Sequence, residues 1–291
     1  MQAGRGTLSG TWGPREMTEV AAGLMVLSGV IHAVVNAILK SGKNKIAGRA
    51  IIDGASALAV LPALPFVPLP TGAWGWLAAS VALHTVYLVA LVRAYETADF
   101  SAAYPVLRGT APLLTAIVSI GILGESASIG DVVGIGLIAA GLFAMAFGRH
   151  LQGRALGWSV GSGVLIAAFT VLDAHGVRAA PSAASFVVWF FALFGVTVGT
   201  LFAWWAGDGL AAAVREQWRP GVAAGVLSVV TWGLGLFALS MGGTASLAAL
   251  RETGMVTALL IATFVFREQV TAGRVVGVLA ITAGAVCIVA L

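Results

Sequence analysis

The chain has 291 residues, of which 59% are apolar and only 10% are charged, and its mean hydropathy is +0.98. An ordinary soluble domain has about 25% charged residues, so this composition excludes a water-soluble globule and a disordered chain. The single cysteine excludes an internally disulfide-bonded fold. The remaining class is a polytopic membrane protein, in which 16 basic against 12 acidic residues indicate topology and not nucleic-acid binding.

Charged residues divide the chain into apolar runs, each long enough for a helix of about 20 residues to cross the hydrocarbon core. The uncharged run 54–92 is too long for one crossing, and four prolines between positions 62 and 70 divide it in two. After a polar N-terminal segment, 1–17, we expect an uncleaved first helix. The sequence therefore predicts an all-α integral membrane protein with ten transmembrane helices, at 18–39, 50–67, 74–94, 101–122, 130–148, 156–175, 184–205, 220–240, 245–266 and 271–290.

Lys and Arg are distributed unequally between the two sides of these spans. The loops after the first, third, fifth, seventh and ninth spans carry eleven of them, Arg215 and Arg219 included, and the opposite side carries three. The positive-inside rule then places the richer side in the cytoplasm. We expect a multi-pass protein of a bacterial inner membrane with both termini in the periplasm.

An internal repeat divides the chain into two halves. Segment 101–141 matches segment 244–284 without gaps, at an offset of 143 residues, and residues 28–30 match residues 162–164 more weakly. Because the repeated unit has five helices, the second copy enters the membrane from the other side. The sequence thus predicts two inverted five-helix repeats, 18–148 and 156–291, an arrangement typical of secondary transporters. The longer match pairs Arg108 with Arg251, Glu125 with Glu268, Gly130 with Gly273, Gly134 with Gly277 and Gly141 with Gly284.

The paired arginines are the first candidates for function. An arginine at the bilayer centre costs about 2.5–3.5 kcal/mol on insertion scales, so Arg108 and Arg251 should face a cavity or a partner. Glu252 is the only acidic residue that we place well inside a span, while Pro105 and Pro112 should loosen the helix around Arg108. We expect the arginines to receive an anionic group such as a carboxylate. The alternative is a buried ion pair that fixes helix register.

Further polar and aromatic side chains fall inside spans and complete the predicted substrate-binding set. His32 and Asn36, four residues apart, share a helix face, and Thr170 takes the position of Asn36 in the second copy. A membrane histidine serves as a proton carrier or as an interhelical hydrogen-bond partner, and a tryptophan can line a pocket or simply pack. The other members are Tyr104, His84, Tyr87, Asp173 and Trp232.

Two pairs of glycines have the spacing that lets helices approach closely, which marks packing and not ligand contact. They are Gly130 with Gly134 and Gly273 with Gly277. Four scattered histidines and one cysteine predict no metal site. We expect no cofactor, and either a monomer or a homodimer.

Three segments carry a resemblance to a known family. Residues 31–40 (IHAVVNAILK), 104–112 (YPVLRGTAP) and 170–178 (TVLDAHGVR), set in the ten-helix plan, resemble the EamA branch of the drug/metabolite transporter superfamily. The resemblance implies a central cavity formed mainly by helices 1, 3, 4, 6, 8 and 9, with helices 5 and 10 at the periphery. His32 resembles the membrane glutamate of the related small multidrug transporters, with imidazole in place of a carboxylate.

Together these features predict a secondary transporter or exporter of small polar metabolites, such as amino acids or other carboxylate-bearing solutes, and not an enzyme. It would work by alternating access at the repeat interface, in the lipid bilayer, with protons as a candidate coupling ion. One alternative is an exporter of lipophilic cations that uses Glu252 or Asp173. A second is an integral membrane transferase acting on a lipid substrate.

Overall fold

The computed structural model describes residues 14–42, 44–97, 100–146, 153–267, 269 and 271–291. In this part of the chain the regular structure is helical and contains no strand. Nine helical segments of it are long and apolar enough to cross a membrane, and a tenth apolar helix is shorter. The expected class, an all-α protein with several membrane-spanning helices, is confirmed, whereas the inverted repeat stays a prediction.

The first five predicted spans each correspond to a helix. They are α1 (Pro14–Ser41), α2 (Lys45–Val60) with its 3-10 continuation η1 (Leu61–Phe66), α3 (Trp74–Thr97), α4 (Phe100–Ala116) with its π-helical continuation η2 (Ile117–Ile122), and the shorter α5 (Ile129–Ala146). The Asn44 side chain accepts a hydrogen bond from the Ala47 amide (3.0 Å), which caps the start of α2.

The last five spans correspond to six helices. They are α6 (Arg154–Ala179), α7 (Ala183–Ala206), α8 (Gly209–Met241), α9 (Thr244–Arg251), α10 (Gly254–Phe264) and α11 (Ala272–Ala290). Ser182 caps α7 by accepting from the Ser185 amide (3.1 Å).

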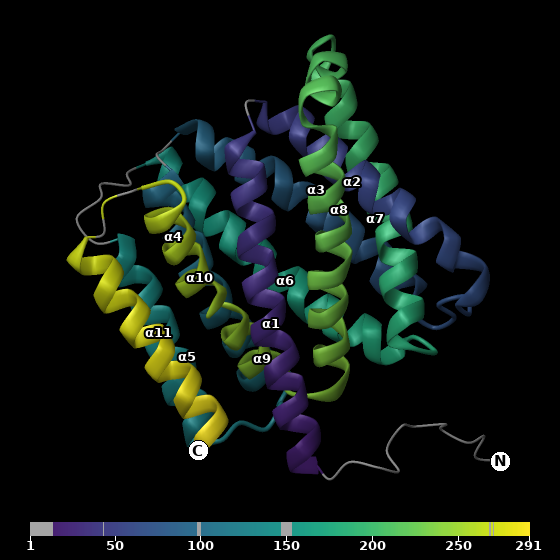
Figure 1. Cartoon of the computed structure of the whole chain (residues 1–291). Helices are drawn as coiled ribbons and strands as arrows, with labels where there is room; N and C mark the ends of the chain where they lie inside the picture. Colours follow the sequence, from purple (N-terminus) through teal and green to yellow (C-terminus); the bar gives the residue numbers. More distant parts are fainter. Residues whose placement is uncertain (1–13, 43, 98–99, 147–152, 268, 270) are drawn as a thin grey trace, which may run out of the picture.

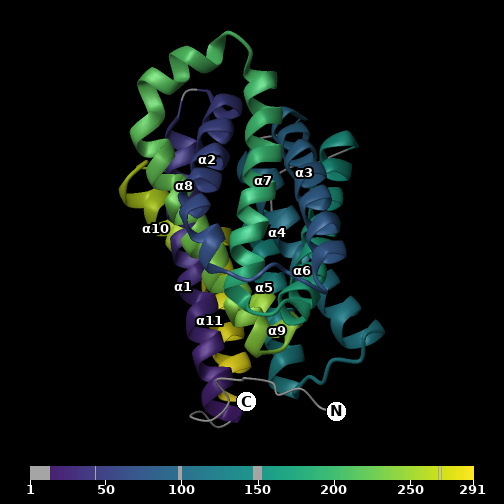
Figure 2. The ribbon, with the colours of Figure 1, turned by 90° about the vertical axis from the view of Figure 1, so that its right-hand side faces the viewer.

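Pro105 and Pro112 lie inside α4, which is continuous up to Ala116 and then passes into η2. Two expectations about the helices were wrong. The span 245–266 is not one helix, because the chain turns between α9 and α10 at Glu252 and Thr253. The segment predicted as a loop before residue 220 belongs to α8, which has Pro220 in its interior. Figure 2 shows the first turns of α8 lying across the end of the bundle before the helix descends.

The helices pack in a crosswise pattern (Figure 1). Helix α1 packs against α8, α9 and α10, and helix α6 packs against α3, α4 and α8. Helix α2 lies between α7 and α8, while α5 and α11 pack mainly on each other along one edge of the molecule. Phenylalanines of α7, among them Phe186, Phe190 and Phe202, form the most buried part of the largest apolar core.

The two ends of the bundle differ in character. One end, called the basic end here, carries the α1–α2 and α7–α8 connections with Lys40, Lys45 and Arg215. The opposite end carries the α4–α5, α6–α7 and α8–α9 connections, and α1 begins and α11 finishes there.

The outer surface is strongly apolar. Phe66, Trp204 and Ile129 are more than four-fifths exposed. A soluble monomer does not expose large apolar side chains on this scale, whereas hydrocarbon tails are a suitable environment for them. The surface therefore fits a chain whose sides face lipid.

Candidate functional site

A central cavity of about 630 Å³ lies inside the bundle. Helices α1 to α4 and α6 to α9 line it, and none of its lining residues in the described part of the chain comes from α5 or α11. The structure brings together at this cavity all the residues predicted to bind substrate: His32, Asn36, His84, Tyr87, Tyr104, Arg108, Thr170, Asp173, Trp232, Arg251 and Glu252. Their contact with a substrate stays a prediction.

Arg108 and Glu252 form a buried ion pair across the two halves of the chain. Nε of Arg108, on α4, lies 2.8 Å from Oε2 of Glu252, which occupies the turn between α9 and α10. The two residues are 7% and 3% exposed, respectively. In such surroundings each charge depends on the other, because an uncompensated buried ion carries a penalty of several kcal/mol.

Arg251 is placed differently from its repeat mate. Its Cζ lies 4.0 Å from the centre of the Trp232 ring, so the guanidinium is held by a cation–π contact. Its Nε and Nη2 atoms are buried and have no hydrogen-bond partner among the described residues. A guanidinium offers a fork of donors that matches a carboxylate, so Arg251 presents an anion-binding group to the cavity.

Close contact between α1 and the α9–α10 turn determines the position of Arg251. A Cβ atom built on Gly29 would lie 2.5 Å from the Arg251 carbonyl oxygen, and one built on Gly254 would lie 2.3 Å from the Gly29 carbonyl oxygen. Gly163 of α6 meets α4 in the same manner, since its Cβ would lie 2.8 Å from the Leu107 carbonyl oxygen. Only glycine permits helix backbones to approach this closely.

Asp173, Ser80 and His84 form a second polar cluster in the cavity wall. Asp173 lies in the interior of α6 and not near its end, and it is 1% exposed. The Ser80 hydroxyl donates to Oδ1 of Asp173, and Nε2 of His84 lies 3.8 Å from Oδ2. The Glu252 carboxylate is thus not the only acidic group deep inside a span, as the sequence had suggested.

Aromatic rings surround His84. Phe169 stacks on the imidazole with ring centres 3.7 Å apart, and Phe190, Phe194 and Trp232 meet it edge-on at 5.1–5.6 Å. The wall of the cavity next to Arg251 and Asp173 is therefore flat and apolar, which suits the apolar part of an amphipathic solute.

Sequence reasoning missed a charged pair on α2. Nη2 of Arg49 lies 2.6 Å from Oδ1 of Asp53, and Asp53 is 2% exposed. Both residues line the cavity towards the basic end, where Lys40 and Lys45 also line it. The signal was the i, i+4 spacing of opposite charges at the start of the second span.

A second hollow of about 600 Å³ lies between α1, α4 and α10. It shares His32, Asn36, Lys40, Tyr104 and Arg108 with the central cavity. These shared side chains form the boundary between the two spaces, so a change at any of them affects both.

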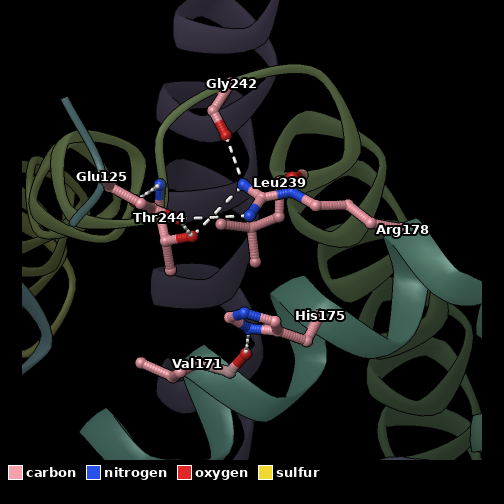
Figure 3. A network of polar contacts seen from close by, with 7 residues as sticks. All are labelled: Glu125, Val171, His175, Arg178, Leu239, Gly242 and Thr244. Carbon is pink, nitrogen blue, oxygen red and sulfur yellow. Dashed lines mark hydrogen bonds and ion pairs between the residues drawn. The ribbon is translucent and has the colours of Figure 1, made fainter. Parts of the chain in front are cut away.

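A polar network joins the connections at the end opposite the basic end (Figure 3). Arg178 of α6 forms an ion pair with Glu125 (3.2 Å) and donates to the carbonyl oxygens of Leu239 (3.0 Å) and Gly242 (2.6 Å). Glu125 also accepts from the amide of Thr244 (2.8 Å), at the first turn of α9. Leu239 also lines the cavity, so the Glu125–Arg178 network lies directly beyond the end of the cavity that is opposite the basic end.

Glu125 lies in a loop and also caps a helix. It belongs to the α4–α5 connection and binds the N-terminus of α9, where a negative charge is favourable. Its counterpart Glu268 lies outside the described residues. Partial burial by itself raises the pKa of Glu125, but hydrogen bonds from Thr244 and Arg178 outweigh burial and hold that pKa below its usual range.

This lowered pKa predicts the pH dependence of the network. The ionised carboxylate stabilises the folded protein above about pH 4.3, the ordinary value for glutamic acid, and the contribution is lost as the pH falls further through the lowered folded-state value. Glu125→Gln should therefore lower the Tm of the detergent-purified protein at neutral pH. In a Tm scan, the difference from wild type should narrow below about pH 4. A difference that stays constant into that range would contradict this role.

The four glycines predicted to mediate packing lie between α5 and α11. A Cβ on Gly130 would meet the Cys287 carbonyl oxygen at 2.6 Å, and one on Gly134 the Gly284 carbonyl oxygen at 2.5 Å. A Cβ on Gly277 would lie 2.6 Å from the Gly141 carbonyl oxygen, and Gly273 is similarly close to α5. These two helices are thus in backbone contact over much of their length.

Comparison with known proteins adds evidence on the fold. No family model and no curated protein matches the chain. Among solved structures, 29 chains match. One of these, a crystal structure of another protein, superposes with a TM-score of 0.73 at 15% sequence identity, over 93% of this chain and 95% of the other. A likeness at this identity concerns the fold alone.

Proposed function

We propose that this protein is a secondary transporter of small carboxylate-bearing solutes, such as amino acids, and not an enzyme. The observation that carries the proposal is Arg251, which faces a cavity within the membrane-spanning bundle with hydrogen-bond donors that no described protein group accepts. An intramembrane ionisable group in such a position marks a substrate or ion pathway. The resemblance to EamA transporters points to the same class.

The packing pattern supports two inverted repeats that alternate access. Each helix of the half 18–148 can be compared with its counterpart in the half 156–291. The contact of α1 with α8 then corresponds to the contact of α6 with α3. In the same way, the contact of α1 with α9 and α10 corresponds to the contact of α6 with α4. Glycines of the first helix of each half, Gly29 and Gly163, make matching close approaches. The site would then lie at the repeat interface, the usual position in transporters of this design.

The two ends of the cavity support an inward-facing conformation. Lys40 and Lys45 line the cavity at the basic end, whereas the Glu125–Arg178 network joins three connections beyond the other end. The positive-inside rule assigns the basic end to the cytoplasm. On this assignment the protein is open to the cytoplasm and closed to the periplasm, and the chain termini are periplasmic in a bacterial inner membrane.

Counterflow in proteoliposomes tests the proposal. The panel contains amino acids, organic acids and lipophilic cations, and wild type is compared with Arg251→Gln and with Arg215→Gln, an exposed control on α8. Loss of one partner of a buried charge pair costs about 2–5 kcal/mol, so Arg251→Gln should weaken anion exchange by about 30-fold or more. The control should exchange as wild type does. Unchanged affinity in Arg251→Gln would reject the assignment of this arginine.

The aromatic wall supports a second candidate, an exporter of lipophilic cations. Asp173 lies beside His84, with Phe169 and Trp232 close by, and aromatic faces with a carboxylate can receive a cation. In the same panel, exchange of cations only, unaffected by Arg251→Gln, would favour this function over the first.

A further inference from the structure

In the described part of the chain, three carboxylates are buried within the membrane-spanning bundle, and one of them differs from the others. Asp53 has Arg49 within ion-pair distance, and Glu252 has Arg108. Among the described residues, neither Lys nor Arg lies within 4 Å of the Asp173 carboxylate, although this residue is 1% exposed. A buried carboxylate without a paired cation is costly to keep ionised.

The hydrogen bonds around Asp173 leave two acceptor atoms facing each other with no proton between them. Nδ1 of His84 donates to the Ser80 carbonyl oxygen (2.9 Å), which can only accept, so a neutral His84 carries its proton on this nitrogen. The other nitrogen, Nε2, is then an acceptor. It is buried, has no hydrogen-bond partner, and lies 3.8 Å from Oδ2 of Asp173. Two acceptors therefore face each other 3.8 Å apart, and a proton added to either one, with a side-chain shift of less than about 1 Å, would let them form a hydrogen bond.

The charged and titratable groups near this pair come from few helices. Of the helices packed against α6, helix α7 contributes no titratable side chain, and α8 contributes Trp232, which carries no ionisable group. The groups that face the cavity from the remaining helices, or lie beside Asp173 on α6, are His84 and Tyr87 on α3, Tyr104 and Arg108 on α4, Arg251 on α9, Glu252 at the end of α9, and His175 and Arg178 on α6.

Of the arginines among these groups, Arg251 is the one that forms no ion pair with a described carboxylate. Arg108 forms an ion pair with Glu252, and Arg178 forms an ion pair with Glu125. His175 donates to the Val171 carbonyl oxygen of its own helix (Figure 3). Its ring also stacks on Trp76. Arg251 and Asp173 both line the cavity, and the Trp232 ring connects them: its centre lies 4.0 Å from Cζ of Arg251 and 5.2 Å from the centre of the His84 ring.

We propose that Ser80, His84 and Asp173 form a proton-binding site that takes up a proton when an anion binds to Arg251. The inference rests on the proposed function, which it deepens by naming the coupling ion and the sign of coupling. With the cavity empty of anions, the charge of Arg251 balances an ionised Asp173. A bound carboxylate neutralises Arg251, and Asp173 then takes a proton from solution and shares it with Nε2 of His84. Anion and proton are therefore bound together and cross the membrane together.

An infrared titration of the reconstituted protein tests the site without any substrate. A protonated carboxylic acid has a carbonyl band that disappears on ionisation, and the pH-difference spectrum should contain such a band from Asp173. Asp173→Asn should remove it, while Asp131→Asn, which removes a carboxylate outside the cavity, should keep it. Should Asp173→Asn fail to fold, Ser80→Ala should move the midpoint of the band to higher pH, because it removes a donor to the ionised form. A spectrum unchanged by both variants of the site would overturn the proposal.

Benzoate is the probe for coupling, because its carboxylate and flat ring match Arg251 and the aromatic wall. Mixed with the protein in weakly buffered solution containing a pH indicator, it should cause uptake of about one proton per bound anion. Its apparent Kd should rise by about tenfold per pH unit in the range where Asp173 loses its proton. Asp173→Asn should bind benzoate without proton uptake, and Asp131→Asn should behave as wild type does.

The outcomes separate the two proposals. Benzoate binding that depends on Arg251 but takes up no proton rejects the proton site and leaves the proposed function standing. If benzoate does not bind and no solute of the panel exchanges, the proposed function fails. The infrared band alone then decides the proton site: its loss in Asp173→Asn supports the site, and its persistence overturns it.

Discussion

Glu252→Gln is expected to be among the most destabilising single substitutions in this chain. The glutamine has nearly the shape of glutamate, so the main change is that Arg108, 7% exposed, loses the carboxylate 2.8 Å from its Nε. Removal of one partner of a buried ion pair costs about 3–5 kcal/mol, because the other charge stays buried and uncompensated. Denaturant unfolding in detergent micelles, followed by tryptophan fluorescence, measures the loss.

The double variant Arg108→Gln/Glu252→Gln is the control for this prediction. With both charges removed, two amides can form a hydrogen bond with each other, and most of the lost stability should return. A double variant as unstable as Glu252→Gln alone would mean that the two charges do not compensate each other. Glu125→Gln, which affects an ion pair whose side chains are 33% and 20% exposed, should cost much less than Glu252→Gln.

Gly29→Ala should disrupt both packing and transport. The added methyl group would lie 2.5 Å from the Arg251 carbonyl oxygen and 3.1 Å from the Gly254 amide nitrogen, which are backbone atoms and cannot rotate away. The α9–α10 turn must then move, and Arg251 and Glu252 move with it. Overpacking of this kind costs about 1–3 kcal/mol, and we expect counterflow to fall at least as far as in Arg251→Gln.

Gly23→Ala is a matched control on the same helix. A Cβ at Gly23 would have no atom within 4 Å, so the substitution should leave transport unchanged and alter stability by less than about 1 kcal/mol. Equal loss of counterflow in the two alanine variants would show that α1 tolerates no alanine in general. The close approach to Arg251 would then not be the cause.

Much of the fold could be predicted from hydropathy alone. Each of the ten expected spans overlaps a helix or a pair of consecutive helices, since a membrane requires long apolar segments. The cavity residues could also be anticipated, because polar groups such as Arg108, Asp173 and Glu252 are too costly in lipid and must face the interior. The sequence also offered a buried ion pair as an alternative role for these charges, and Arg108 and Glu252 form one.

The features that could not be predicted depend on how the halves meet. The α4 helix contains two prolines and is continuous up to Ala116, whereas the turn occurs in the second half at Glu252, where the sequence has no proline. The position of the turn depends on tertiary packing, because Gly29 and Gly254 allow the backbone of α1 to contact the backbone of that turn. Sequence also could not reveal that Arg108 is neutralised and Arg251 is not, because this depends on which side of the turn Glu252 points to. Asp53 was missed because it lies next to the expected start of its span.

The ion pair between Arg108 and Glu252 has a consequence for biogenesis. Arg108 is synthesised 144 residues before its counter-ion, a delay of about 7–30 s at ordinary translation rates of roughly 5–20 residues per second. During this interval Arg108 cannot yet pair with Glu252, and the close contact between Gly29 and the α9–α10 turn has not yet formed. The newly inserted first half must therefore keep the Arg108 guanidinium hydrated, or held by the insertion machinery, until the ribosome delivers the second half. The two halves can thus be assembled only after both have been synthesised.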